Sequence, residues 1–524
     1  MKQASLKSLT LALALGTLVF PLKTYAQTAS FTIVPVVTRS DQLPGGTAGF
    51  FTCEHCAGTI PGTRIFNNKG DLIFQATGDF CLGGLFLHSG VTNSPLIREC
   101  AATPGGTTFF SVGQASLNDQ GEAAILTFVQ EGNIARNLLL LYAGGQFTQI
   151  VATGEQSPFG TTITGCGIFG IGINSKGEIV FEACSEDAAG NLRSDVYVYS
   201  NGTIRGIVKS GDPSPIGGNL SFIGLGPGPR INDKGEVLFP SSVDIGPAFH
   251  KSGLFLATNE GVKKIVLGDD PLPTGGVVER YIPILGDFNA NSEVAFQAAI
   301  TDGPTDGGVF VFSNGEIRKI AATGDPSPAG GKFVFRPDLF FELAFPEPRI
   351  NNHGAVAFLS EIKKGSFRSA IFLGSTKAAV KVVAVGERLP SGEKIQRIDS
   401  YALNDMGEVA FFAYGKGEGP LGVFKAIPVA PQITSIKLKR KGGRPELRVN
   451  GTAMITNDTV IEVNGVALEP TSYPAEFREN GGTTTRVVSR DSRLDEMIPA
   501  GATVQVRVFN PLTNVHSGPM AFTR

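Results

Sequence analysis

The residues whose type and spacing come closest to a chemical site are six acids at one position of a repeated turn. Each stands three residues before a proline, and together they are Asp41, Glu155, Asp212, Asp270, Asp325 and Glu387. In a ring of repeats these carboxylates would form a circle on one face, able to bind a polyvalent cation such as Ca²⁺ or a basic partner. The alternative is that each acid caps a turn whose φ the following proline fixes. We favour turn capping, because the acids recur in nearly every repeat and a functional site usually breaks repeat symmetry.

The six cysteines form the second candidate group, and all of them lie in the first three repeats. An even number of cysteines in an exported chain favours disulfide bonds. Reflecting the chain through two hairpin turns brings two pairs opposite each other, and the third pair follows by elimination. The expected bonds are Cys56–Cys81, Cys166–Cys184 and Cys53–Cys100. A zinc site on Cys53 and Cys56 is the alternative, but a single Cys-x-x-Cys pair is weak support for zinc.

Other catalytic patterns are missing from the sequence. No serine sits in a Gly-x-Ser-x-Gly turn, and the five histidines are scattered without the spacing of metal ligands. Tryptophan is absent, which weakens a sugar-binding role that depends on aromatic stacking. We therefore predict no catalytic residues, no bound metal and no cofactor, with Ca²⁺ at the acid circle as the one exception considered.

The elements that would position any site are repeated hairpins. Seven segments carry an asparagine, a glycine three residues later and an apolar residue, usually phenylalanine, four beyond that. The asparagines are Asn67, Asn118, Asn174, Asn232, Asn289, Asn351 and Asn404. Asparagine at the first position of a type I turn can accept a hydrogen bond from its own backbone, and glycine at the fourth position tolerates positive φ. The fifth copy has Ser292 in place of glycine, so we expect a looser turn there.

An acid also follows the turn glycine in six copies. These residues are Asp71, Glu122, Glu178, Glu236, Glu293 and Glu408. We expect them to be solvated charges at strand edges, where charge discourages pairing with other chains.

Each repeat contains about four short strands, which is the content of one propeller blade. A further strand at 33–37 precedes the first hairpin, and its counterpart is missing after the seventh. We therefore predict an all-β fold in which residues 27–428 form a seven-bladed β-propeller, with the N-terminal strand closing the last blade.

A different β pattern begins after a proline-rich boundary at 428–433. Strands are expected at 433–436, 447–451, 460–465, 498–501 and 504–511. Short strands in fewer than a hundred residues suit a sandwich, so residues 429–524 are expected to form an immunoglobulin-like β-sandwich.

The first 26 residues have the features of a signal peptide. Lys2 and Lys7 precede an apolar run from 9 to 20, and Thr24 and Ala26 supply small residues for cleavage. We expect a secreted or extracytoplasmic protein without a membrane span. The totals of 45 Lys and Arg against 47 Asp and Glu argue against a nucleic-acid partner.

The repeats resemble the bacterial extracellular tandem repeats built on Asn-x-x-Gly-x-x-Ala-Phe, which are similar to HAF-type repeats. Asn351, Gly354, Ala357 and Phe358 carry the pattern in full, as does the copy that begins at Asn404. The order of motifs in 431–524 resembles the IPT/TIG family of immunoglobulin-like domains. The first resemblance implies an extracellular protein and supplies no catalytic residues, and the second implies a spacer or binding module.

These features favour a secreted or cell-surface protein that binds a macromolecule or a glycan through a propeller face, without catalysis. The alternative is an extracellular hydrolase or lyase with a site in the central channel. Such a site would be built from residues that differ between repeats, and the irregular segment 333–348, in the longest interval between repeated asparagines, is the first place to look.

Overall fold

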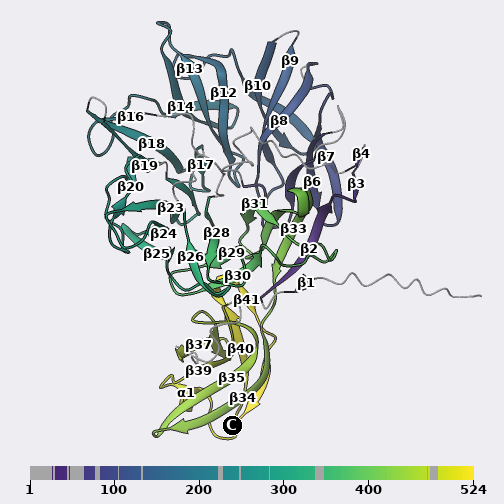
Figure 1. Ribbon diagram of the computed structural model, residues 1–524, viewed down its shortest axis with the longest axis vertical. Coiled ribbons are helices and arrows are strands. Elements are labelled where there is room, and N and C mark those ends of the chain that lie inside the picture. Colours follow the sequence, from purple (N-terminus) through teal and green to yellow (C-terminus); the bar gives the residue numbers. More distant parts are fainter. Residues whose placement is uncertain are drawn as a thin grey trace, which may run out of the picture.

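The protein consists almost entirely of antiparallel β-sheet, as its computed structural model shows (Figure 1). The structure describes residues 26–27, 30–43, 46–47, 64–76, 83–103, 106–131, 134–221, 228–246, 249–281, 284–336, 347–418, 420–468, 470–472 and 482–524. Helix in these residues is limited to α1 (Leu494–Met497) and the 3₁₀ turns η2 (Lys416–Glu418) and η4 (Pro511–Thr513). None of these is long or apolar enough to cross a membrane.

Seven sheets of three to five strands follow one another through the described part of residues 26–428 and surround a common centre (Figure 1). The first sheet contains β5 (Leu72–Ala76), β6 (Gly84–Ser89) and β7 (Thr92–Arg98). The second contains β8 (Thr108–Leu117), β9 (Ala123–Glu131), β10 (Ile134–Ala143) and β11 (Gln146–Ala152). The third contains β12 (Thr162–Ile173), β13 (Ile179–Glu186), β14 (Leu192–Ser200) and β15 (Thr203–Val208).

The next three sheets each have five strands. The fourth sheet contains β16 (Asn219–Ser221), β17 (Arg230–Ile231), β18 (Val237–Gly246), β19 (Phe249–Thr258) and β20 (Gly261–Leu267). The fifth contains β21 (Val277–Val278), β22 (Leu285–Phe288), β23 (Val294–Thr301), β24 (Gly307–Ser313) and β25 (Glu316–Ala322). The sixth contains β26 (Lys332–Val334), β27 (Arg349–Ile350), β28 (Val356–Lys363), β29 (Ser369–Gly374) and β30 (Ala379–Ala384).

The seventh sheet joins the two ends of this region. It contains β31 (Arg397–Leu403), β32 (Val409–Tyr414) and β33 (Pro420–Pro428), together with β1 (Ala26–Gln27) and β2 (Phe31–Thr38). Strand β2 runs antiparallel to β33, with Phe31 opposite Pro428 and Thr38 opposite Gly422. The expected pairing of the N-terminal strand with the last sheet is therefore confirmed. A separate two-stranded sheet pairs β3 (Gln42–Leu43) with β4 (Gly46–Thr47).

The repeated asparagine organises each turn through its side-chain oxygen. In the first hairpin, Oδ1 of Asn67 accepts hydrogen bonds from the backbone N–H groups of Lys69 at 3.0 Å and Asp71 at 2.9 Å. The backbone N–H of Gly70 donates to the Asn67 carbonyl oxygen at 3.1 Å, and Gly70 has a φ of 83°. The turn chemistry predicted from Asn-x-x-Gly is thus present, because the asparagine supplies the acceptor and the glycine supplies the positive φ.

The side-chain nitrogen of the same asparagines links neighbouring hairpins. In every copy Nδ2 donates to the backbone carbonyl oxygen of the next repeated asparagine, and the seventh copy donates back to the first. The distances are 3.1 Å from Asn67 to Asn118, 3.0 Å from Asn118 to Asn174, 2.9 Å from Asn174 to Asn232, 3.4 Å from Asn232 to Asn289, 3.0 Å from Asn289 to Asn351, 3.2 Å from Asn351 to Asn404 and 3.2 Å from Asn404 to Asn67. We call this closed circle of hydrogen bonds the asparagine ring.

The acids after the turn glycine are not solvated edge charges, so that expectation is wrong. In six hairpins Nδ2 of the repeated asparagine also donates to the carboxylate four residues on, at distances between 2.7 and 3.1 Å. Each of these acids is half-buried. They therefore hold the amide groups of the asparagine ring in position, which a sequence pattern of charge at strand edges does not reveal.

Ser292 does not loosen the fifth turn, which corrects a second expectation. Its backbone N–H donates to the Asn289 carbonyl oxygen at 3.1 Å, as in the glycine copies, and its φ is 65°. Its Oγ donates to Oε2 of Glu236 in the preceding hairpin at 2.6 Å. This bond offsets the backbone strain that a non-glycine residue carries at positive φ.

Phenylalanine pairs fill the sheets. The phenylalanine four residues after the turn glycine stacks on one in the next strand, with ring centroids 5.6 to 5.9 Å apart. The pairs are Phe74–Phe86, Phe239–Phe255, Phe296–Phe310, Phe358–Phe372 and Phe411–Phe424. Such offset contacts bury large apolar areas, so one repeated residue supplies much of each core.

Residues 432–524 form a second unit of two antiparallel sheets around one core. One sheet contains β34 (Gln432–Lys441), β35 (Arg444–Ile455), β38 (Pro470–Ser472) and β39 (Thr483–Ser489), and the other contains β36 (Val460–Val463), β37 (Val466–Leu468), β40 (Thr503–Asn510), β41 (Val515–His516) and β42 (Met520–Thr523). The strand expected at 498–501 is absent, because these residues follow α1 and place Ile498 in the core. Strand β39 has no counterpart among the expected strands, because its residues are largely polar.

The two units share a buried contact. Ile455 and Leu512 of the C-terminal unit lie in one core cluster with residues of the sixth and seventh sheets, including Ala355 and Val380. Asn514 donates through Nδ2 to Nε2 of His353, 3.1 Å away in the sixth hairpin. The C-terminal unit therefore packs directly on the ring (Figure 1).

Candidate functional site: a buried arginine and carboxylate cluster

The six acids singled out from the sequence lie in exposed or half-buried turns. In five of them a carboxylate oxygen accepts a hydrogen bond from the backbone N–H three residues earlier, as between Asp270 and Leu267 at 2.9 Å. Glu155 differs, since its carboxylate accepts from the Gln149 side chain at 2.9 Å. These contacts agree with turn capping, and Ca²⁺ or basic-partner binding at the acids stays a prediction.

Three of the six acids also form ion pairs with lysines. Lys264 pairs with Asp270 and Lys319 with Asp325, both at 2.9 Å, and Lys381 contacts Glu387 in the same way. In the part of the chain that the structure describes, no group of three His, Cys, Asp or Glu side chains is arranged to hold a metal ion.

Two of the six cysteines can be followed. Cys100 and Cys184 are both disulfide-bonded. Cys53, Cys56 and Cys81 lie outside the described residues, and so does the side chain of Cys166. The three predicted pairings stay predictions.

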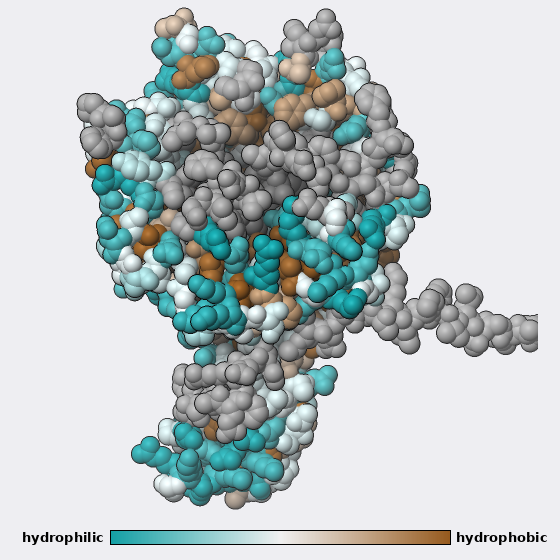
Figure 2. Space-filling view, in the orientation of Figure 1, coloured by the Kyte–Doolittle hydropathy of each residue, from teal (hydrophilic) through white to brown (hydrophobic). Residues whose placement is uncertain are grey.

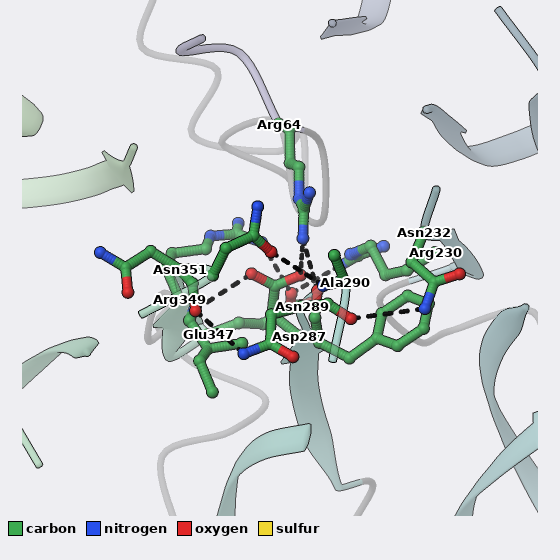
Figure 3. Close-up of polar contacts among 12 residues, drawn as sticks. Arg64, Arg230, Asn232, Asp287, Asn289, Ala290, Glu347, Arg349 and Asn351 are labelled. Atoms are coloured by element: carbon green, nitrogen blue, oxygen red, sulfur yellow. Dashed lines mark hydrogen bonds and ion pairs between the residues drawn. The ribbon is translucent and has the colours of Figure 1, made fainter. Parts of the chain in front are cut away.

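A different group of charged and polar side chains meets at the centre of the ring, and we call it the central cluster (Figure 3). All its members stand two to four residues before a repeated asparagine, on or beside the innermost strand of a sheet. They are Arg64, Arg230, Asp287, Glu347, Arg349 and Tyr401.

Glu347 is the hub of this cluster. Its Oε2 lies 2.5 Å from Nη2 of Arg230 and 3.2 Å from Nη1 of Arg349. Its backbone carbonyl oxygen accepts a hydrogen bond from the Tyr401 hydroxyl at 2.8 Å. Glu347 thereby links the innermost strands of the fourth, sixth and seventh sheets.

Asp287 forms the second acidic point, on β22. Its Oδ2 accepts from the backbone N–H of Ile350 at 3.3 Å, and its Oδ1 lies 4.0 Å from Nη2 of Arg64. The same nitrogen of Arg64 also donates to the carbonyl oxygen of Phe288. The Arg64 side chain is 37% exposed, whereas the Asp287 side chain is 3% exposed, so Arg64 forms the solvent-facing side of the cluster.

Burial governs the electrostatics of the cluster. It lowers the pKa of Arg230, an effect that the nearby Glu347 carboxylate opposes. It raises the pKa of the Tyr401 hydroxyl far above its usual range, so this tyrosine stays protonated and can donate. Among the described residues, the cluster contains three arginines and two carboxylates.

Several polar atoms of the cluster have no hydrogen bond. Among the described residues, Oδ1 of Asp287, Oε1 of Glu347 and Nε of Arg349 are buried without a hydrogen-bond partner. Buried polar groups are normally satisfied, and leaving one unpaired costs about 1–3 kcal/mol. Oδ1 of Asp287 thus has only the 4.0 Å ion pair with Arg64, and among the described residues Oε1 of Glu347 and Nε of Arg349 have no hydrogen bond. Ligand hydroxyl groups can donate to such oxygens, and an acidic group can pair with the arginines.

The sequence contained a signal for this cluster that repeat analysis overlooked. The position two residues before the repeated asparagine is Arg230, Asp287 and Arg349 in the fourth to sixth copies, but Ile65, Ser116, Gly172 and Ala402 in the others. Glu347 falls in the segment 333–348 singled out as irregular, of which 337–346 lies outside the described residues. An alignment of the copies at the repeated asparagine shows charged residues two positions before it where the other copies have small or apolar ones. That comparison identifies three of the six members of the central cluster.

Several solved structures resemble this chain distantly. The β-propeller domain of the Trilobed protease from Pyrococcus furiosus matches at 9% identity and a TM-score of 0.38, over 66% of this chain and 90% of that one. The polysaccharide lyase Uly1 matches at 8% identity and a TM-score of 0.38, over 74% of this chain and 94% of that one. A sialidase from Trypanosoma rangeli matches at 11% identity and a TM-score of 0.32, over 78% of this chain and 58% of that one. At these scores the likenesses carry no argument about function.

The search of curated proteins finds no match. One family covers most of the repeat region, with matches at residues 24–267 and 246–427. Together these matches span well over half of the chain, so the protein belongs to the family of unknown function DUF7453.

Proposed function

We propose that this protein is an exported binding protein whose central cluster holds the anionic, hydroxyl-bearing unit of a glycan. Among the described residues, the arginines of the cluster outnumber its carboxylates and would attract an acidic group, and arginine offers the planar donors that suit a carboxylate. Sugar hydroxyls can donate to the unpaired carboxylate oxygens and accept from the unpaired guanidinium nitrogen. An acidic sugar residue supplies all three kinds of contact in one ligand.

One observation carries this proposal. Oε1 of Glu347 and Oδ1 of Asp287 are buried beside three arginines and, among the described residues, accept no hydrogen bond. Both carboxylates form ion pairs with arginines, but a buried oxygen without a hydrogen bond is costly, so an ion network kept only for stability would use these oxygens as well. Strongly desolvated charges at the centre of a fold are candidates for a functional site.

The architecture that we propose around this site is the one expected from the sequence. The seven sheets are taken as seven propeller blades, and the second unit as an immunoglobulin-like sandwich of the IPT/TIG type. The asparagine ring and the pairing of β2 with β33 support the first assignment. The two sheets around one core support the second. Residues 1–26 are proposed to be removed on export.

Catalysis at the same cluster is the alternative function. Two carboxylates beside a bound sugar can act as general acid and base in glycoside cleavage. Asp287 and Glu347 supply such a pair, and Tyr401, held protonated, would serve only as a donor. A hydrolase or lyase would release shorter products from an acidic oligosaccharide, whereas a binding protein would return it intact.

The test is a calorimetric titration of the full mature chain with glucuronic acid, N-acetylneuraminic acid and neutral glucose. We expect at least one acidic sugar to bind while glucose does not, and we expect Arg64→Gln to weaken that binding about tenfold or more. Arg318→Gln is the matched control, because Arg318 is an exposed residue of β25 outside the cluster. Equal binding of acidic and neutral sugars, or equal losses in the two variants, would overturn the proposal. Chromatography of acidic oligosaccharides after long incubation then separates binding from cleavage.

A further inference from the structure

The outer face of one sheet in the C-terminal unit is strongly basic. Its described residues include seven basic side chains on β34, on β35 and on or just after β39, which are Lys437, Lys439, Lys441, Arg444, Arg448, Arg486 and Arg490. We call this set the basic face. The only acid among the described residues of this face is Glu446, whose side chain is 1% exposed.

Strand register places these residues on one side of the sheet. Lys437 pairs with Arg448, Lys439 with Glu446 and Lys441 with Arg444. Directly opposed residues of antiparallel strands share a face. Asn450 pairs with Arg486, which continues the same face onto β39.

The opposite side of these strands is the apolar core. Leu447 and Val449 alternate with the outward residues of β35 and are completely buried. Strand β34 follows the same alternation, with Lys437 and Lys439 exposed on either side of the partly buried Leu438. The lysines are therefore fixed to the outside by the packing of their neighbours.

Glu446 orients the arginines of the face. Its Oε1 accepts from Nε of Arg448 at 2.5 Å, and its Oε2 accepts from Nε of Arg490 at 2.7 Å. Burial alone would raise the pKa of Glu446, but these guanidinium groups hold it below its usual range, so the acid stays ionised. Arg486 is held in a similar way by Oδ1 of Asn450 at 2.8 Å. Arginines that are held through Nε still have other N–H groups that can donate to a partner. Because their side chains are already ordered, less side-chain entropy is lost when a partner binds.

The charge of this face contrasts with the rest of the protein. Among the described residues of the face, seven basic residues against one acid give a net charge of +6, while the remaining chain has 38 Lys and Arg against 46 Asp and Glu. Concentrated charge of one sign is the electrostatic footprint expected for a partner of opposite sign. In Figure 1, β34 and β35 are labelled at the end of the C-terminal unit away from the ring, and Figure 2 shows a predominantly hydrophilic surface there.

We propose that the basic face is a docking surface for a linear acidic polysaccharide. Alternate residues of a strand lie about 6.8 Å apart and neighbouring strands about 4.8 Å apart, so the cations form a flat grid. A polymer with a carboxylate on each sugar can lie across such a grid and pair with several cations at once.

Other polyanions fit this face less well. The described residues of the face include no aromatic side chain, whereas single-stranded nucleic acids are held largely by base stacking on aromatic rings. Proteins that lie on a bilayer insert apolar and aromatic groups between the lipids, whereas Val488, an apolar residue opposite Arg448 on this face, is only 5% exposed. Purely electrostatic pairing with a soluble, charged polymer requires neither feature.

The test measures binding of fluorescent alginate to the full mature chain at roughly 50 mM and roughly 500 mM NaCl. This increase in salt shortens the Debye length from about 13 Å to about 4 Å and so screens the charges of the face. The variant is the triple change Lys437→Gln, Lys439→Gln and Lys441→Gln. The matched control changes three exposed propeller lysines without ion pairs among the described residues, as Lys176→Gln, Lys209→Gln and Lys332→Gln.

We expect the chain to bind alginate at low salt, to lose most of that binding at high salt, and to bind neutral dextran at neither. The triple variant should weaken binding about tenfold or more and show a smaller salt dependence, because fewer counterions are released. The control triple should match the unmodified chain. An equal loss in both triples, or tighter binding to vesicles with 30% phosphatidylglycerol or to single-stranded DNA than to alginate, would overturn the proposal. The triple variant should still bind the acidic sugar of the central cluster with unchanged affinity, which separates this surface from that cluster.

Discussion

The side-chain amide of Asn404 donates to the backbone carbonyl oxygen of Asn67, 3.2 Å away, although 337 residues separate the two in the chain. This bond completes the asparagine ring. Each asparagine of the ring stabilises its own turn through Oδ1 and contacts the next hairpin through Nδ2. The ring brings the ends of the innermost strands together. The central cluster lies on those strands, so the geometry of the candidate site depends on closure.

Asn404→Ala should destabilise the whole propeller region. The change removes the donor to Asn67 and to Glu408, and it leaves the backbone N–H of Glu408 without its acceptor. Loss of buried hydrogen bonds of this kind predicts a fall of about 2 kcal/mol or more in the free energy of unfolding, measured by urea denaturation. Asn219→Ala, at an exposed strand position, should change it by less than about 0.5 kcal/mol. Equal effects would contradict a structural role for the ring.

Two substitutions of Ser292 distinguish the energetic effect of backbone strain from that of its side-chain hydrogen bond. Ser292→Ala keeps a side chain at a φ of 65° and removes the hydrogen bond to Glu236, so it should lower the melting temperature. Ser292→Gly removes the same bond but also the strain, which offsets about 1 kcal/mol of the loss. Calorimetry should therefore rank the alanine variant below the glycine variant. The reverse order would show that the serine is not strained.

Stability should fall as pH rises between about 4.5 and about 7 because of Glu182. Burial raises the pKa of this carboxyl to about 7, despite the hydrogen bond from Ser194. The folded state then holds the proton more tightly than the unfolded state, so the contribution is complete below pH 4.5 and is lost as pH rises through 7. The limit for one group titrating alone is about 3 kcal/mol.

Glu182→Gln provides the control for this prediction. The amide oxygen can still accept from Ser194, but the side chain no longer titrates. Urea denaturation of the variant at pH 5 and pH 7 should show a smaller difference than the unmodified chain. If the two pH dependences coincide, Glu182 does not titrate in this range.

The contact between the two units should be energetically significant. Leu512 is 3% exposed and packs in a core cluster with residues of the sixth and seventh sheets. Leu512→Ala should cost about 3 kcal/mol and make the segment between the units more sensitive to protease. Leu468→Ala, in the core of the C-terminal unit itself, should destabilise that unit without exposing the segment. Identical digestion patterns would argue against docking.

Local turn chemistry was predictable from the sequence, and contacts across sheets were not. Asn67 and Gly70 lie within one turn, so their types predict its geometry. The donation from Asn67 to Asn118 crosses 51 residues and has no local signal. The same holds for Glu236, whose partner Ser292 lies in the next hairpin.

In the candidate site, too, residue positions within a repeat were predictable from the sequence, whereas contacts between sheets were not. Arg230 and Arg349 occupy equivalent repeat positions, so an alignment of the copies would have singled them out. Their shared bond to Glu347 depends on how the ring closes, which no spacing along the chain specifies. In the C-terminal unit, the apolar residues at 498–501 looked like a strand but instead follow a helical turn into the core.

Hydrogen exchange of the backbone amides in β2 tests closure of the ring most directly. Because β2 pairs with β33 along nearly its whole length, those of its amides that face β33 should exchange as slowly as the amides of β32 in the same sheet. Mass spectrometry of peptides covering residues 31–38 and 409–414 measures both. Rapid exchange across 31–38 with full protection at 409–414 would contradict a ring closed by the N-terminal strand.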